Sequence, residues 1–131
     1  MKKLRLQTVA VVLFTATTLM SCSKDDEGNT VTKTEFVTNV TGATTATVNQ
    51  EVPLNVTYHV DGTCGVFEKT VESTTGNTTT IEVKVKYATP TCSGPTTQTT
   101  AYKFKKATAG TYILKFKKSA TEFITQTIVV N

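Results

Sequence analysis

The chain has 131 residues and a formal net charge of +4, from 14 basic and 10 acidic side chains. Lys2, Lys3 and Arg5 supply most of this excess, because eleven lysines and ten acidic residues remain without them. So small a surplus argues against a nucleic-acid-binding protein, since contacts with a phosphate backbone require a clear cationic excess. The length suits one domain with one core.

Residues 1–21 have the layout of a secretory signal peptide. The three basic residues precede a short apolar stretch, Val9–Phe14, and Leu19-Met20-Ser21 leads up to Cys22. The segment is too short and too rich in threonine to span a bilayer stably. We therefore expect residues 1–21 to be removed and to play no part in the fold.

Cys22 stands at the expected cleavage point and resembles the lipidated cysteine of bacterial lipoproteins. The run Ser23-Lys24-Asp25-Asp26-Glu27 that follows is similar to the export signal of surface lipoproteins of the Bacteroidota. The resemblance implies a lipid anchor at Cys22, in the outer membrane and facing the cell exterior. Two plainer interpretations remain, a secreted protein with a chance cysteine and an acidic run that only solubilises the tether. The predicted organisation is a lipidated cysteine and flexible acidic tether over residues 22–32, followed by one domain over residues 33–131.

Cys64 and Cys92 remain as an even pair once Cys22 is assigned to lipid. In an oxidising compartment such a pair favours a structural disulfide. The alternatives are a redox-active pair or a metal site, but there is no C-x-x-C motif, and His59 is the only histidine, without a third ligand at useful spacing. We therefore expect a disulfide, no metal and no cofactor.

The region after the tether shows alternating apolar and polar residues and no convincing helical period. A turn is expected at Asp61-Gly62, and threonine-rich loops over Ser73–Thr80 and Thr89–Thr100. The predicted strands are Thr34–Val40 and Ala43–Val48, split around Gly42, then Val52–Val60, Val66–Phe67, Thr80–Tyr87, a strand through Tyr102 and Phe104, a strand from Tyr112 to Phe116, and Glu122–Val130.

One face of each predicted strand is apolar. The clearest rows are Val52, Leu54, Val56, Tyr58 and Val60 in one strand and Ile81, Val83, Val85 and Tyr87 in another. Seven or eight such strands in about 100 residues predict an all-β fold, an antiparallel sandwich of two sheets with one face of each strand buried. A closed barrel is the alternative.

The segment Ala109-Gly110-Thr111-Tyr112 resembles the tyrosine corner of immunoglobulin-type domains. The resemblance implies an Ig-like sandwich in which the Tyr112 hydroxyl bonds back to the chain; otherwise Tyr112 is a plain core aromatic. The segment Ala46–Leu54 is similar to the entry to the second strand of bacterial Ig-like domains, with Asn49 where those domains carry glycine. Asparagine tolerates the left-handed conformation that this position requires.

Candidate catalytic residues are few. His59 has no serine or cysteine nucleophile beside it in the sequence, and a catalytic triad needs base and nucleophile within hydrogen-bond reach. Glu68 and Glu72 form a conceivable carboxylate pair, but their even spacing is equally typical of one solvated strand face. We expect no enzyme.

Lysines offer a candidate binding surface. In an Ig-like strand order, Lys84 and Lys86 lie near Lys103 and Lys105 on one outer face, with Lys115, Lys117 and Lys118 on the opposite sheet. Such a basic face would attract acidic glycans, lipopolysaccharide phosphates or an acidic partner. The alternative is the ordinary use of lysine to keep sheet surfaces soluble.

The sequence thus predicts a lipid-anchored, non-catalytic binding or adhesion module for a glycan or protein ligand, which it would engage through its loops. A structural accessory subunit of an outer-membrane assembly, bound through an open sheet edge, is the second hypothesis. An inhibitor of host enzymes, with the cysteine-braced loop as the inserting element, is the third.

Overall fold

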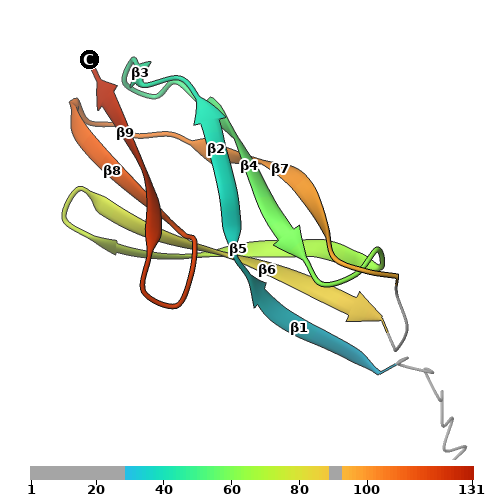
Figure 1. Cartoon of the computed structure of the whole chain (residues 1–131). Helices are drawn as coiled ribbons and strands as arrows, with labels where there is room; N and C mark the ends of the chain where they lie inside the picture. Colours follow the sequence, from blue (N-terminus) through green and yellow to red (C-terminus); the bar gives the residue numbers. More distant parts are fainter. Residues whose placement is uncertain (1–28, 89–92) are drawn as a thin grey trace, which may run out of the picture.

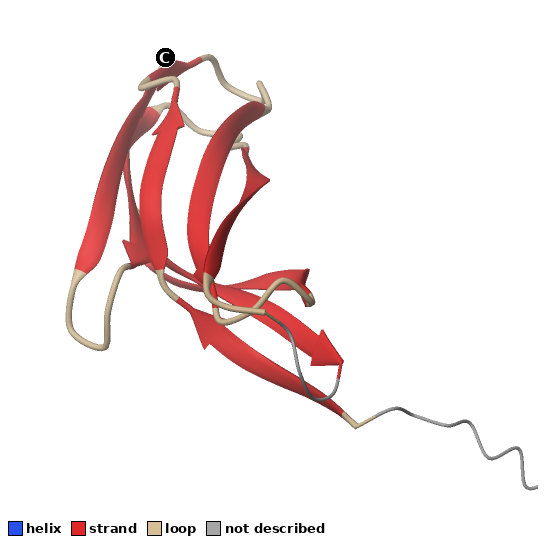
Figure 2. Ribbon diagram, turned by 45° about the vertical axis from the view of Figure 1, so that its right-hand side comes forward, coloured by secondary structure: helices blue, strands red, loops and turns tan. Residues whose placement is uncertain are grey.

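The computed structural model describes residues 29–88 and 93–131. The predicted signal peptide, Cys22, most of the predicted tether and Cys92 lie outside these residues. The described chain forms nine strands in two sheets, without a helix (Figure 1, Figure 2). The predicted all-β fold of two sheets is therefore confirmed.

The two sheets differ in size. The small sheet has the order β2-β4-β7, with β2 at Val37–Gly42, β4 at Val52–Val60 and β7 at Thr96–Phe104. The large sheet curls like part of a barrel. It contains β1 (Thr30–Glu35), β6 (Thr78–Ala88), β8 (Gly110–Lys117), β9 (Phe123–Val130) and β3 (Thr45–Ala46) in this order, with β5 (Gly65–Thr75) on the free side of β6.

The expectation of purely antiparallel pairing is wrong. β6 pairs in parallel with β8, from Thr78 opposite Ile113 to Ile81 opposite Phe116, and β3 pairs in parallel with β9. The remainder of β6 pairs with β1 on the same side, starting at Glu35 opposite Val83. An immunoglobulin-type sandwich consists of two antiparallel sheets, so the two-sheet architecture agrees with the prediction while the parallel β6–β8 pairing departs from it.

The first predicted strand, Thr34–Val40, is in fact two strands in different sheets. β1 ends at Glu35 in the large sheet, and β2 begins at Val37 in the small one. Phe36 makes the crossing, and its carbonyl accepts a 2.9 Å hydrogen bond from the backbone amide of His59. β1 also begins at Thr30, so the last residues of the predicted tether belong to the fold.

The core lies between the sheets and follows the predicted alternation. Tyr102 packs edge-on against Phe116, with 5.6 Å between ring centroids. Burial of a large apolar side chain contributes roughly 1.5–3 kcal/mol, so these rows supply most of the favourable free energy of folding. The buried residues include all five of the β4 row and, from β6 and β8, Ile81, Val83, Val85, Leu114 and Phe116.

The predicted threonine-rich loop Ser73–Thr80 is wrong. These residues belong to the long β5–β6 hairpin, which turns only at Gly76-Asn77, where Gly76 has a φ of +60°. The predicted short strand Val66–Phe67 is the start of the 11-residue β5. Threonine is β-branched and suits a pleated strand, so its abundance here marks strand rather than loop.

Candidate functional site

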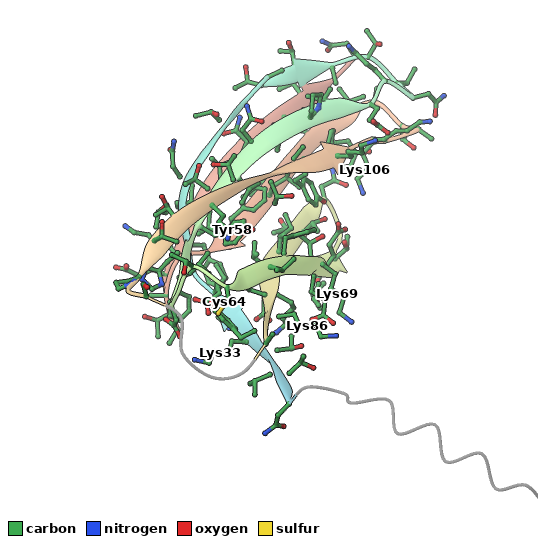
Figure 3. All side chains as sticks on the ribbon, turned by 90° about the vertical axis from the view of Figure 1, so that its right-hand side faces the viewer. Lys33, Tyr58, Cys64, Lys69, Lys86 and Lys106 are labelled. Atoms are coloured by element: carbon green, nitrogen blue, oxygen red, sulfur yellow. The ribbon has the colours of Figure 1, made fainter. Side chains whose placement is uncertain are left out.

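The start of the folded domain lies beside the loop that carries Cys64. Thr30, the first residue of β1, pairs with Ala88, the last residue of β6. The sulfur of Cys64 lies 3.8 Å from the carbonyl oxygen of Ala88. We call this part of the molecule, with Thr30, Asp61–Gly65 and residues 93–95, the tether end. It is opposite the C-terminus in Figure 1, and Figure 3 shows Lys33 and Cys64 there, well separated from Lys106.

The partner expected for Cys64 is Cys92, which lies outside the described residues. The backbone next to each cysteine is nevertheless in contact, because the Thr63 amide donates a 3.2 Å hydrogen bond to the carbonyl of Ser93. The disulfide stays a prediction, and the geometry around it is consistent with one.

A polar cluster lies where the chain crosses from one sheet to the other, with Asp61 at the tether end and Glu35 at the opposite end of β1 from Thr30. The Nδ1 atom of His59 lies 3.6 Å from Oε2 of Glu35 and 3.7 Å from Oδ1 of Asp61. We call these three residues the Glu35–His59–Asp61 cluster. Glu35 is only 4% exposed, His59 is half-buried and Asp61 is exposed.

Two further side chains hold the carboxylates of this cluster in place. The Tyr87 hydroxyl donates a 2.6 Å hydrogen bond to Oε1 of Glu35 and accepts one of 3.0 Å from the backbone amide of Asp61. The Lys33 ammonium donates a 2.8 Å hydrogen bond to Oδ2 of Asp61. Each carboxylate therefore has one oxygen fixed by a donor and the other directed at the imidazole of His59.

These contacts shift the pKa values around the cluster. The hydrogen bond from Lys33 lowers the pKa of Asp61, and the same hydrogen bond raises the pKa of Lys33. Burial raises the pKa of Tyr87, and its hydrogen bond to Glu35 raises it further. Tyr87 is therefore a neutral donor over the physiological pH range.

The spacing of residues along the sequence did not reveal this cluster. His59 seemed isolated because its main partner, Glu35, comes from a distant strand. The signal that was present is His59-x-Asp61 at the end of an apolar strand, which places an imidazole and a carboxylate next to each other at a turn.

A shallow depression of about 400 Å³ lies next to the cluster, lined by His59, Pro95, Thr96 and Thr97. The sequence offered no nucleophile beside His59, and this depression contributes threonine side chains and a proline. It gives solvent and small ligands room on the His59 side of the cluster.

The residues that resemble those of Ig-like domains lie at the end of the molecule opposite the tether end. The Tyr112 hydroxyl donates a 2.8 Å hydrogen bond to the carbonyl of Thr108, the back-bond expected of a tyrosine corner, and Gly110 has a φ of +153°. Asn49 adopts the expected left-handed conformation with a φ of +63°, and its amide donates a 2.7 Å hydrogen bond to the carbonyl of Lys106. This bond ties loop 47–51 to loop 105–109, and we call the two loops the far-end loops.

The predicted basic face does not form. Lys84 and Lys86 lie on β6 in the large sheet, whereas Lys103 lies on β7 in the small sheet and Lys105 follows the end of β7. The prediction assumed that the two strands are neighbours, but of the nine described strands only β4 pairs with β7.

Lys84 belongs instead to a charge cluster with Glu82 and Lys117. Glu82 lies 3.0 Å from the Lys84 ammonium and 2.8 Å from that of Lys117. These two lysines were expected on opposite sheets, and the β6–β8 pairing brings them together. Hydrogen bonds from Lys117 and Lys84 lower the pKa of Glu82. Lys84 also donates a hydrogen bond to the Thr34 hydroxyl, so this cluster ties β1, β6 and β8.

Comparison with known protein families, with curated proteins and with solved structures gives no match. Among residues 29–88 and 93–131, no helix is long and apolar enough to cross a membrane.

Proposed function

We propose that the chain is a non-catalytic surface lipoprotein, anchored through Cys22 in the outer membrane, whose β-sandwich binds a glycan or protein ligand outside the cell. One observation carries the proposal: the chain enters the fold at Thr30, at the tether end, while the far-end loops lie at the opposite end (Figure 1). An anchor attached at Thr30 would direct these loops away from the membrane.

The far-end loops are suited to recognition because they are exposed and braced. Besides the bond from Asn49 to Lys106, the amide of Val48 donates a 3.0 Å hydrogen bond to the carbonyl of Asn131. The Lys106 ammonium lies 5.4 Å from the centre of the Tyr112 ring. Val48 keeps 43% of its surface exposed. Loops that are held in place lose less entropy when they bind.

The same geometry weakens the inhibitor hypothesis. Cys64 and residues 93–95 lie at the tether end, so the cysteine-braced loop would face the membrane rather than a host enzyme. In this proposal the loop stabilises the base of the domain.

The anchor is tested by Cys22→Ala in the full-length chain. We expect the wild-type protein in the outer-membrane fraction, labelled by fatty acid and degraded when protease is added to intact cells. The variant should lose the label and leave the membrane. Equal membrane retention of both proteins would contradict the anchor.

Binding is tested with the full-length protein in detergent micelles, on glycan arrays and in pull-downs. Val48→Asp and Lys106→Ala should weaken capture of any ligand at least about tenfold, as for a central contact. Lys69→Ala, an exposed lysine of β5 away from the far-end loops, is the matched control. No ligand, or equal weakening in all three variants, would count against the proposal.

The accessory-subunit hypothesis has its own supporting observation. Among the described strands β5 pairs with β6 only. Beyond Gly65, whose carbonyl accepts a hydrogen bond from the Gln98 side chain, the other edge of β5 is open, and Val66 and Val71 expose 65% and 41% of their surface. An open edge with apolar side chains is a template for a strand of another chain. Under this hypothesis a stoichiometric partner co-purifies from membranes and is lost in Val66→Lys/Val71→Lys, whereas the far-end variants retain it.

A further inference from the structure

The Glu35–His59–Asp61 cluster has the composition of a metal site. Each of the three side chains places one donor atom within 4.8 Å of the other two. Zn²⁺ binds nitrogen and oxygen at about 2.0–2.2 Å, so tetrahedral ligand atoms lie about 3.4 Å apart. The separations of 3.6 Å and 3.7 Å from His59 Nδ1 are close to this value. Asp61, whose side chain is half exposed, can adjust to close the remaining gap.

A second, independent observation is the burial of Glu35 and the surroundings of its two carboxylate oxygens. Its side chain is 94% buried, since only 6% remains exposed, and the hydrogen bond that it accepts within the described part of the chain goes to Oε1 from the Tyr87 hydroxyl. Oε2 faces the imidazole at 3.6 Å, beyond hydrogen-bonding distance, and it keeps contact with solvent, because no buried side-chain oxygen of the described residues lacks a hydrogen-bond partner. A buried carboxylate is costly unless a cation compensates it. The Lys33 ammonium donates its hydrogen bond to Asp61 and interacts with Glu35 only through its charge.

The surrounding contacts are those that orient metal ligands. In protein metal sites the ligating carboxylates are themselves hydrogen-bonded, which fixes their direction and tunes affinity. Here Tyr87 holds Oε1 of Glu35 and Lys33 holds Oδ2 of Asp61, which leaves Oε2 and Oδ1 toward His59. The depression beside His59 leaves a further coordination position accessible to water or a small ligand.

We propose that Glu35, His59 and Asp61 bind a divalent transition-metal ion, with Zn²⁺ as the best match to one imidazole nitrogen and two carboxylate oxygens. Glu35 ends β1, His59 is the last residue but one of β4, and Asp61 follows the end of β4. The ion would join the end of the first strand of the large sheet to the small sheet and to the loop Asp61–Gly65, and so brace the crossing between the two sheets. The site is independent of the proposed ligand-binding loops.

The test is zinc binding by the full-length protein after dialysis against chelator. We expect one zinc per chain by elemental analysis and a melting temperature raised by more than about 4 °C at saturating ZnCl₂. Mg²⁺ at the same concentration should give no shift, because it requires octahedral oxygen ligands.

Variants separate this site from adventitious binding. His59→Ala and Asp61→Asn change partly exposed side chains and should abolish the zinc-dependent shift while the tether acids remain. Tyr87→Phe should weaken zinc binding about tenfold through Glu35. Glu82→Gln, in another charge cluster, should bind zinc like the wild type. The proposal is overturned if the wild type shows no zinc-dependent shift, if His59→Ala shows the same shift, or if Mg²⁺ acts as well as Zn²⁺.

Discussion

The backbone amide of Thr63 donates a 3.2 Å hydrogen bond to the carbonyl oxygen of Ser93. Thr63 precedes Cys64, and Ser93 follows Cys92. A disulfide bridges Cα atoms about 4.4–6.8 Å apart, and a hydrogen bond between the residues next to the two cysteines favours such a separation.

We therefore predict that Cys64 and Cys92 form a disulfide. Intact mass of the Cys22→Ser protein should rise by two hydrogen atoms on reduction. Cys64→Ser should lower the free energy of unfolding by roughly 3–4 kcal/mol, the loop-closure contribution for this spacing. Cys64→Ser/Cys92→Ser should be no less stable than either single variant. Two thiols that react with iodoacetamide in the native protein would contradict the pairing.

The second prediction concerns the back-bond of Tyr112. Tyr112→Phe removes the 2.8 Å hydrogen bond to the Thr108 carbonyl and should lower the free energy of unfolding by about 1 kcal/mol. Urea denaturation measures the loss. Thr108→Ala keeps the carbonyl acceptor and should change stability by less than about 0.5 kcal/mol. An equal loss in both variants would mean that the threonine side chain, not the back-bond, matters.

Local features of the sequence were sufficient to predict the buried strand rows and the conformation of single residues. The β4 row is buried as expected, and Asn49 is left-handed, because side-chain alternation and backbone preference depend on a few adjacent residues. The hydrogen bond from Tyr112 to Thr108 joins residues only four positions apart in the sequence, so it could be predicted for the same reason.

The crossing at Phe36 could not be predicted in this way. A single strand over Thr34–Val40 gives no reason to bury the charged Glu35 in place of the aromatic Phe36, yet Glu35 is 4% and Phe36 40% exposed. The reversal depends on Tyr87, which meets Glu35 only after β1 has paired with β6. A buried carboxylate whose donor is distant in sequence leaves no local signal.

The prediction of a shared basic face of lysines was wrong for a related reason. Which strands become neighbours is decided by non-local pairing, and the parallel contact between β6 and β8 replaced the expected one between β6 and β7. Lys84 therefore meets Glu82 and Lys117 rather than Lys103.

The third prediction is a pH-dependent contribution from Glu82. Because its pKa lies below the ordinary value of 4.5, its ion pairs stabilise the fold above that pH, and their contribution is lost as the pH falls through the lowered pKa. At pH 7, Glu82→Gln should be less stable than the wild type by about 1 kcal/mol. Denaturant titrations from pH 7 to pH 3 should show this difference shrinking toward zero.

Glu51→Gln is the matched control for this measurement. Glu51 pairs with Lys103 at 3.1 Å, but both side chains are more than half exposed, so solvent screens the pair and the variant should lose less than about 0.5 kcal/mol. A difference for Glu82→Gln that persists at pH 3 would show that packing rather than charge is lost.

The last prediction concerns the close approach of Gly65 to the core. A Cβ at this position would overlap the γ1 methyl group of Val60 and lie 2.8 Å from Cε1 of Tyr87. Gly65→Ala should therefore lower the free energy of unfolding by roughly 1–3 kcal/mol. Val60→Ala makes room for the new methyl group, so the double variant should be more stable than the sum of the single losses predicts, by at least about 0.5 kcal/mol.

Gly76 supplies the control for this cycle. It has a φ of +60°, and no atom of the described residues lies within 4 Å of the position that an added methyl group would occupy, so Gly76→Ala strains only the backbone. Its loss should add to that of Val60→Ala without coupling, because the two sites share no contact. Denaturant melts of the six proteins give both coupling energies. Coupling at Gly76 as large as at Gly65 would show that the strain at Gly65 does not arise from its contact with Val60.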